Sequence, residues 1–140
     1  MHDFYEINFY NEDEYLMKWS NNMKSFEFKL YGGFTLTFDK ETLTIDVKGL
    51  KGIFFQRVKP RHKVIPYDQI LRIDYKGAGM TVGYVRFITP ELVDYPSSMY
   101  VAENDENSLL FEKDELEKFN ELMDYLHKKL PNVEKQLKKI

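Results

Sequence analysis

The chain has 140 residues and a net charge of −3 at neutral pH. This length suits one domain that buries roughly two-thirds of its unfolded surface. The slight excess of acidic residues argues against a general nucleic-acid-binding protein, because such proteins neutralise phosphates with basic side chains. The chain has no cysteine, which excludes disulfide bonds and thiolate metal sites. Its 11 phenylalanines and 10 tyrosines favour β structure, since these side chains suit half-buried strands.

The N-terminal residues lack the basic start and apolar core of a signal peptide. No apolar run approaches the length of a membrane-spanning helix, so we expect a cytoplasmic protein. Apolar positions 5, 7 and 9 alternate with polar ones, which suggests a short strand, and the pattern at 12–19 predicts a short helix. We expect residues 1–23 to form an N-terminal strand–helix extension that packs on the main domain.

Most of the chain that follows alternates apolar and polar residues with the period of half-buried strands. The alternation is clearest in KSFEFKL, FTLTF and LTIDV, and the short polar connection between the last two indicates a hairpin. Strands are expected at residues 24–30, 34–38, 43–47, 53–58, 70–75, 82–88, 99–102 and 108–111, with 63–66 as a further short extended piece. Seven of these strands, counted from Phe34, would build the main sheet.

The sequence GAGMTVG joins the strands expected at 70–75 and 82–88. Glycine-rich loops bind phosphate when a helix follows them, because the amides at the start of the helix face the phosphate. Here a strand follows, so the sequence predicts a hairpin turn and no nucleotide site.

Residues 112–130 carry the clearest helical pattern in the chain. Apolar residues at positions 116, 119, 123, 126 and 130 recur at steps of three and four and form one stripe. Acidic residues crowd the first turn and basic residues the last, which matches the helix dipole. Pro131 ends the helix. Residues 132–140 form a short basic tail that we expect to add one turn or to fray.

These elements predict an α+β fold that is mainly β. Closely spaced strands without helices between them cannot form parallel βαβ units, so the strands should be antiparallel. About seven antiparallel strands and one amphipathic helix would build a small barrel whose open end the helix caps. We expect residues 24–131 to form this domain.

Three stretches of the sequence resemble a bacterial pleckstrin-homology-like family of uncharacterised function: TLTFDKETLTI, PYDQILRIDYKGAGMTVGYVRF and ENDENSLLFEKDELEKFNELMDYL. Members of that family often occur beside a short helical C-terminal (SHOCT-type) module. The resemblance covers roughly residues 34–130 and implies the pleckstrin-homology (PH) barrel, its C-terminal helix and a non-enzymatic binding role. It implies no particular site, because the family has no established activity.

Residues 48–63 contain a series of basic residues with no acidic residue between them. The candidate binding residues are Lys51, Phe54, Arg57, Lys59, Arg61 and Lys63. The cations could face an acidic protein or the headgroups of anionic lipids. Phe54 and Phe55 face opposite sides of a strand, and the outward ring would lie beside Arg57 as in a protein-binding hot spot. The alternative is a solvated hairpin that balances the acidic remainder, with the outward ring beneath the N-terminal extension.

The sequence contains no catalytic or metal-binding pattern. Its three histidines, His2, His62 and His127, lie far apart, and no serine or histidine has the context of an activated nucleophile. We therefore expect no enzyme activity, no cofactor and no metal. The leading hypothesis is a protein-interaction domain, of adaptor or inhibitor type, from a bacterium or phage.

Other functions stay open at the level of sequence. The same basic face could bind an anionic membrane peripherally. A hydrolase with an unrecognised site is a third hypothesis. Edge strands or the aromatic N-terminus could also pair two copies as a homodimer. No nucleic-acid partner is expected.

Overall fold

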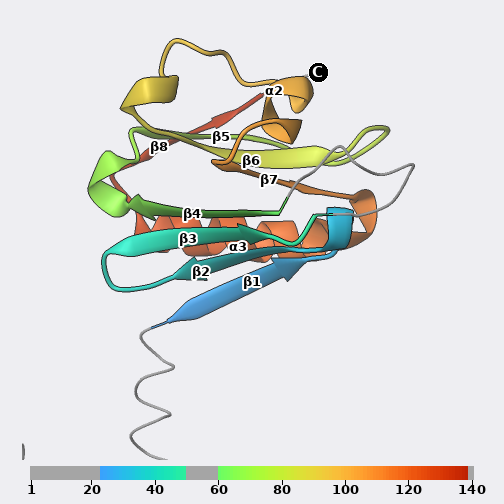
Figure 1. The fold of residues 1–140 in the computed structure, drawn as a ribbon, viewed down its shortest axis with the longest axis horizontal. Helices are drawn as coiled ribbons and strands as arrows, with labels where there is room; N and C mark the ends of the chain where they lie inside the picture. The colour runs from blue at the N-terminus through green and yellow to red at the C-terminus, as the bar shows by residue number, and fades with distance from the viewer. Residues whose placement is uncertain (1–22, 50–59, 139–140) are drawn as a thin grey trace, which may run out of the picture.

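The computed structural model describes residues 23–49 and 60–138 and folds them into two four-stranded sheets and a long C-terminal helix (Figure 1). Nearly all of the expected N-terminal extension, residues 1–22, lies outside the described part, and so does the strand expected at 53–58. The mainly β class predicted from the sequence is confirmed.

Sheet A consists of β1 (Lys24–Phe28), β2 (Phe34–Phe38), β3 (Thr42–Val47) and β4 (Arg61–Pro66), all antiparallel and in that spatial order. The strict alternation in its first three strands places apolar side chains on one face, where they are buried. Polar residues, mostly threonines in β2 and β3, occupy the other face. The hairpin predicted from FTLTF and LTIDV is confirmed.

Sheet B consists of β5 (Arg72–Lys76), β6 (Gly83–Ile88), β7 (Ser108–Phe111) and β8 (Glu134–Leu137), in the spatial order β7-β6-β5-β8. The hairpin predicted around GAGMTVG joins β5 to β6. β8 pairs with β5 in parallel, so the expectations of purely antiparallel strands and of a turn or frayed end after Pro131 were wrong. The side chains of β8 give no strand signal. Its backbone instead finds hydrogen-bond partners along the otherwise open edge of β5.

Helix α3 (Leu116–Lys129) is the helix predicted from the apolar stripe, and it ends before Pro131 as expected. It packs against both sheets through aromatic rings. Phe119 stacks on Phe111 of β7 with ring centroids 4.5 Å apart, and Tyr125 lies 4.9 Å from Phe38 of β2. The helix thereby completes the hydrophobic core to which both sheets contribute.

The two sheets do not join into the expected closed barrel. In residues 23–49 and 60–138, no strand of sheet A pairs with a strand of sheet B. The chain passes from one sheet to the other at Pro66, which has no N–H to donate, and at the 3-10 helix η3 (Tyr67–Gln69) that follows it. This turn separates β4 from β5 and leaves two sheets with α3 packed against both.

The strand expected at 99–102 is instead the short helix α2 (Met99–Glu103), so that prediction was wrong. Ser98 caps the helix, because its Oγ accepts a hydrogen bond from the N–H of Val101 at 3.2 Å. Ala102 is fully buried where α2 packs on β6 and β7. The cap and this contact outweigh the strand preference of the sequence. The remaining 3-10 helices are η2 (Leu30–Gly32), η4 (Pro90–Leu92) and η5 (Lys113–Glu115).

Residues 89–107, here called the covering segment, connect β6 to β7 and include η4 and α2. The covering segment (gold to orange in Figure 1) lies against sheet B on the side away from sheet A. Every residue of β6 and β7 is buried, because the core covers one face of these strands and the covering segment covers the other. Sheet A has no such cover in the described part, and its strands keep exposed or partly exposed outer faces.

Candidate binding surface

A buried network of charged side chains fixes the covering segment to sheet B. Its centre is Arg86 of β6, whose side chain is 1% exposed. The Nε of Arg86 donates to Asp105 Oδ2 at 2.7 Å, and its Nη1 donates to the carbonyl oxygen of Tyr95 at 2.8 Å and to Ser97 Oγ at 3.0 Å. One guanidinium group therefore holds the segment at points before and after α2.

Asp74 extends this network to β5, where it lies opposite Arg86 and is fully buried. Its carboxylate accepts two hydrogen bonds from Arg72, at 2.7 and 3.1 Å, and one from Ser97. Burial has the largest single influence on the pKa of Asp74 and raises it. The hydrogen bonds from Arg72 and Ser97, with the positive charges of Arg72 and Lys138, outweigh burial and lower the pKa. Asp74 is thus charged, and its hydrogen-bond partners and the nearby positive charges compensate the cost of burying its carboxylate.

The covering segment exposes large apolar side chains. Val93 is 48% exposed, Tyr95 60%, Met99 37% and Tyr100 74%. They lie on either side of Ser97, which the buried network holds in place. Aromatic and apolar side chains on an immobilised backbone are typical of protein-binding surfaces, because the backbone has little freedom left to lose on binding.

The covering segment is also acidic. It contains Glu91, Asp94, Glu103, Asp105 and Glu106 and no Lys, Arg or His. Asp105 pairs with Arg86, and Glu103 accepts a hydrogen bond from the hydroxyl of Tyr31 at 3.0 Å. The surface therefore combines apolar side chains with an excess of negative charge.

Four of the site residues predicted from the sequence, Lys51, Phe54, Arg57 and Lys59, lie outside the described residues. The other two, Arg61 and Lys63, lie in β4 and pair with buried residues of β3, so both are on the core-facing side of sheet A. Burial lowers the pKa of Arg61, while the charges of Asp105 and Glu106 act to raise it. At least Arg61 therefore lies within the electrostatic reach of the covering segment.

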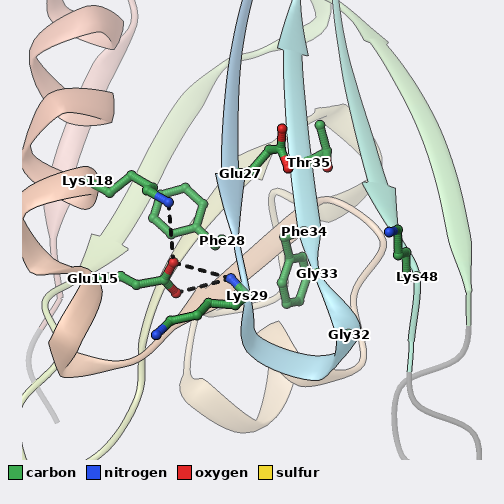
Figure 2. A pocket seen from close by; sticks show the side chains of 10 residues that line it. All are labelled: Glu27, Phe28, Lys29, Gly32, Gly33, Phe34, Thr35, Lys48, Glu115 and Lys118. Carbon is green, nitrogen blue, oxygen red and sulfur yellow. Dashed lines mark hydrogen bonds and ion pairs between the residues drawn. The ribbon is translucent and has the colours of Figure 1, made fainter.

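A second candidate site is a hollow of about 320 Å³ beside the turn between β1 and β2, lined in part by Lys29, Lys48 and Lys118 (Figure 2). Glu115 accepts hydrogen bonds from the backbone N–H of Lys29 at 3.2 and 3.3 Å and pairs with Lys118 Nζ at 3.6 Å. Lys29 Nζ also pairs with Asp114 at 2.6 Å. Lys48 alone of the three lysines has no ion pair with a described residue. The protein's own carboxylates thus offset most of the positive charge here, which disfavours an anion site.

The turn beside this hollow has a constrained backbone. Tyr31 has φ 56° and Gly32 has φ 82°, both in the left-handed region. A Cβ atom on Gly32 would lie 2.2 Å from the carbonyl oxygen of Gly49, so the position requires glycine. The hydrogen bond from Tyr31 to Glu103 therefore joins a tightly fixed turn of sheet A to the end of α2.

The acidic residues and histidines of the described part were compared with the requirements of a metal site. Within the described ranges, no group of three or more His, Asp or Glu residues could hold a metal ion. The carboxylates of Asp74 and Asp105 are engaged by hydrogen-bond donors inside the network, which gives them a structural role. Among the helices that the structure describes, none has the length and apolar character needed to cross a bilayer.

One protein family matches most of the domain. A family model described as a domain of unknown function, DUF4429, matches residues 36–126, which is more than half of the chain. The chain belongs to the DUF4429 family. The DUF4429 match begins in β2 and ends in α3, so it includes the buried network and the whole covering segment. No curated protein and no solved structure matches the chain.

The sequence did not reveal this surface of the DUF4429 domain. Residues 89–98 lie between the strands expected at 82–88 and 99–102 and contain two prolines, so their sequence predicts a loop. The available signal was the length of the connection between β6 and β7, since long connections in compact domains are often functional. Neither alternation nor turn chemistry indicates that such a connection folds back over a strand.

Proposed function

We propose that this DUF4429 protein is a non-enzymatic protein-interaction module, of adaptor or inhibitor type, that binds its partner through the covering segment. The observation that carries the proposal is the set of exposed apolar side chains on a segment immobilised by Arg86. Single exposed apolar residues are normal on protein surfaces, whereas several on one fixed segment are typical of an interaction site.

We also propose that the two sheets and α3 are a PH-like architecture, and that the protein works in the cytoplasm of a bacterium or of a phage-infected cell. The order of the elements from β1 to α3, seven strands followed by a long helix, supports the PH-like assignment, and β8 is an addition to it. The three stretches that resemble the bacterial PH-like family support it as well.

An anionic membrane is the less favoured partner. The covering segment carries negative charge, which anionic headgroups would repel. In the hollow beside β1 and β2, two of the three lysines are already paired with carboxylates. A protein partner is consistent with both observations.

The test is protein capture from nuclease-treated bacterial lysate with the tagged full chain. We expect the wild type to retain one protein in stoichiometric amount and the Tyr95→Ala/Tyr100→Ala variant to lose it. The matched control is Val64→Ala/Leu71→Ala, which shortens side chains that are 47% and 49% exposed outside the covering segment. Equal capture by all three forms would overturn the proposed surface.

A further form, Arg57→Glu/Lys59→Glu, tests the basic residues predicted from the sequence. If only this form loses the captured protein, the interface lies at the basic residues of 48–63 and not at the covering segment. If the wild type retains no protein but binds vesicles of anionic lipid in a salt-sensitive way, the membrane hypothesis replaces ours. Sedimentation of the purified chain will show whether it forms a homodimer.

A further inference from the structure

The charge of the partner can be inferred from the carboxylates of the covering segment. Glu91, Asp94 and Glu106 are exposed and form no ion pair with any residue of 23–49 or 60–138. The segment itself supplies no cation to offset them. The carboxylate of Glu91 accepts a hydrogen bond from Thr89 and interacts with the charge of Lys63, and Glu106 interacts with that of Arg61. Because all three carboxylates are exposed, a partner that brings basic side chains can still reach them.

The aromatic residues of the same segment favour the same kind of partner. Tyr95 and Tyr100 are more than half exposed, and the face of a tyrosine ring attracts a Lys or Arg side chain. An arginine is especially suited to such a surface, because its planar group can stack on a ring while it pairs with a carboxylate. Polyanions such as nucleic acids and acidic membranes would be repelled.

We propose that the covering segment binds an extended stretch of a partner protein in which arginine or lysine residues alternate with apolar ones. This inference rests on the proposed function and specifies the chemistry of the partner. The exposed apolar positions run from Val93 to Tyr100 on both sides of Ser97. An extended chain that follows the segment can therefore contact more of these side chains than a single protruding side chain of a partner could. The network around Arg86 fixes the segment before binding, which reduces the entropy lost on association.

The probes are two synthetic peptides, one in which arginine alternates with leucine and one in which glutamate replaces each arginine. Each is titrated into the isotope-labelled full chain, and the backbone amide shifts are followed by NMR. We expect the arginine peptide to shift the amides of residues 89–107 and the glutamate peptide to leave them in place. A third peptide, with serine in place of leucine, should bind more weakly because it lacks the apolar contacts.

Charge reversal identifies the carboxylates involved. The variant Glu91→Lys/Asp94→Lys/Glu106→Lys should weaken binding of the arginine peptide about tenfold, which equals about 1.4 kcal/mol and suits a few exposed ion pairs. The matched control is Glu117→Lys/Glu121→Lys/Asp124→Lys, which makes the same change in net charge at exposed positions of α3. The control should retain most of the affinity.

Each other outcome has a defined meaning. Equal weakening by both charge-reversed variants, or peptide-induced shifts centred outside residues 89–107, would overturn the inference. Loss of lysate capture with Tyr95→Ala/Tyr100→Ala but not with the acidic-site variant would leave the proposed function standing and make the basic partner wrong. Capture that neither variant changes would overturn the covering segment as the binding surface, and with it this inference. Self-association that depends on the tyrosines, without peptide binding, would assign the surface to a second copy of the chain.

Discussion

The outer faces of the two sheets show two ways in which a strand carries polar residues. On sheet A, Thr35, Thr37 and Thr44 point outward and are partly exposed. On sheet B, Asp74 and Arg86 occupy the corresponding outward positions and are buried. The β2–β3 and β5–β6 pairs are both antiparallel, so strand pairing does not explain the difference. The covering segment explains it, because it lies over sheet B.

This comparison teaches that the alternation of apolar and polar residues predicts which face of a strand is buried in the core. It does not predict whether the polar face is exposed to water or covered by another segment. An outward threonine meets water, and its branched side chain favours the strand. An outward charge beneath a loop must instead find partners within the protein, since an unpaired buried charge is very costly. Polar side chains on the covered sheet should therefore matter far more for stability than those on the open sheet.

The largest expected effect follows from removing Arg86. The Arg86→Met variant removes the positive charge that pairs with Asp105 and the donor to the carbonyl of Tyr95, and we expect a loss of about 3–5 kcal/mol in the free energy of unfolding. The matched change on the open sheet, Thr44→Val, should alter it by less than about 0.5 kcal/mol. Urea unfolding measures both. Similar losses for the two variants would contradict the contrast between the sheets.

A second effect tests how tightly the start of β6 is packed. A Cβ atom on Gly83 would lie 2.5 Å from the carbonyl oxygen of Lys76 and 2.5 Å from Cζ of Phe111, so Gly83→Ala should cost about 1–3 kcal/mol. Gly79 belongs to the same hairpin and has open space around its Cα, so Gly79→Ala should be nearly neutral. Thermal unfolding of the two variants distinguishes them. Equal melting temperatures would show that β6 can shift to make room.

A smaller effect concerns pH and the buried carboxylate of Asp74. Because the pKa of Asp74 is lower in the folded protein than its unfolded value of about 3.9, its contribution to stability is present above that value. The contribution is lost as the pH falls through the lowered pKa. The difference in unfolding free energy between wild type and Asp74→Asn should therefore be largest near neutral pH and shrink below about pH 4. A difference that stays constant from pH 7 to pH 3 would argue against a lowered pKa.

The smallest effect is expected at the cap of α2. Ser98→Ala removes the hydrogen bond from the N–H of Val101 and should cost about 1 kcal/mol at most, since α2 is only five residues long and buries only Ala102 fully. The loss should be local, with the α2 amides showing faster exchange in NMR while Tyr95 and Ser97 remain held by Arg86. Global destabilisation as large as that of Arg86→Met would show that α2, and not the buried network, anchors the covering segment.

The sequence predicted the elements in which side-chain pattern decides the structure. The alternation of Phe34, Leu36 and Phe38 predicts β2, and the apolar stripe that includes Phe119 and Leu126 predicts α3. Both elements bury one face and expose the other, so their periodicity records their environment directly.

The elements that were missed depend on tertiary contacts. β8 forms because the edge of β5 offers hydrogen-bond partners, and α2 forms because Ser98 caps it and Ala102 packs on sheet B. The candidate surface was missed for the same reason. The partners of Arg86 lie nine to nineteen residues further along the chain, and no local pattern connects them.

The pairing of β8 with β5 has a consequence for local unfolding of sheet B. β8 is four residues long, and its side chains are exposed or only partly buried, so few contacts besides the ladder hold it in place. Its amides should exchange with solvent well before those of the β5–β6 hairpin. When β8 separates, the edge of β5 becomes a row of free N–H and C=O groups that can accept another strand. By covering the edge of β5, β8 thus prevents that edge from pairing with a strand of another molecule.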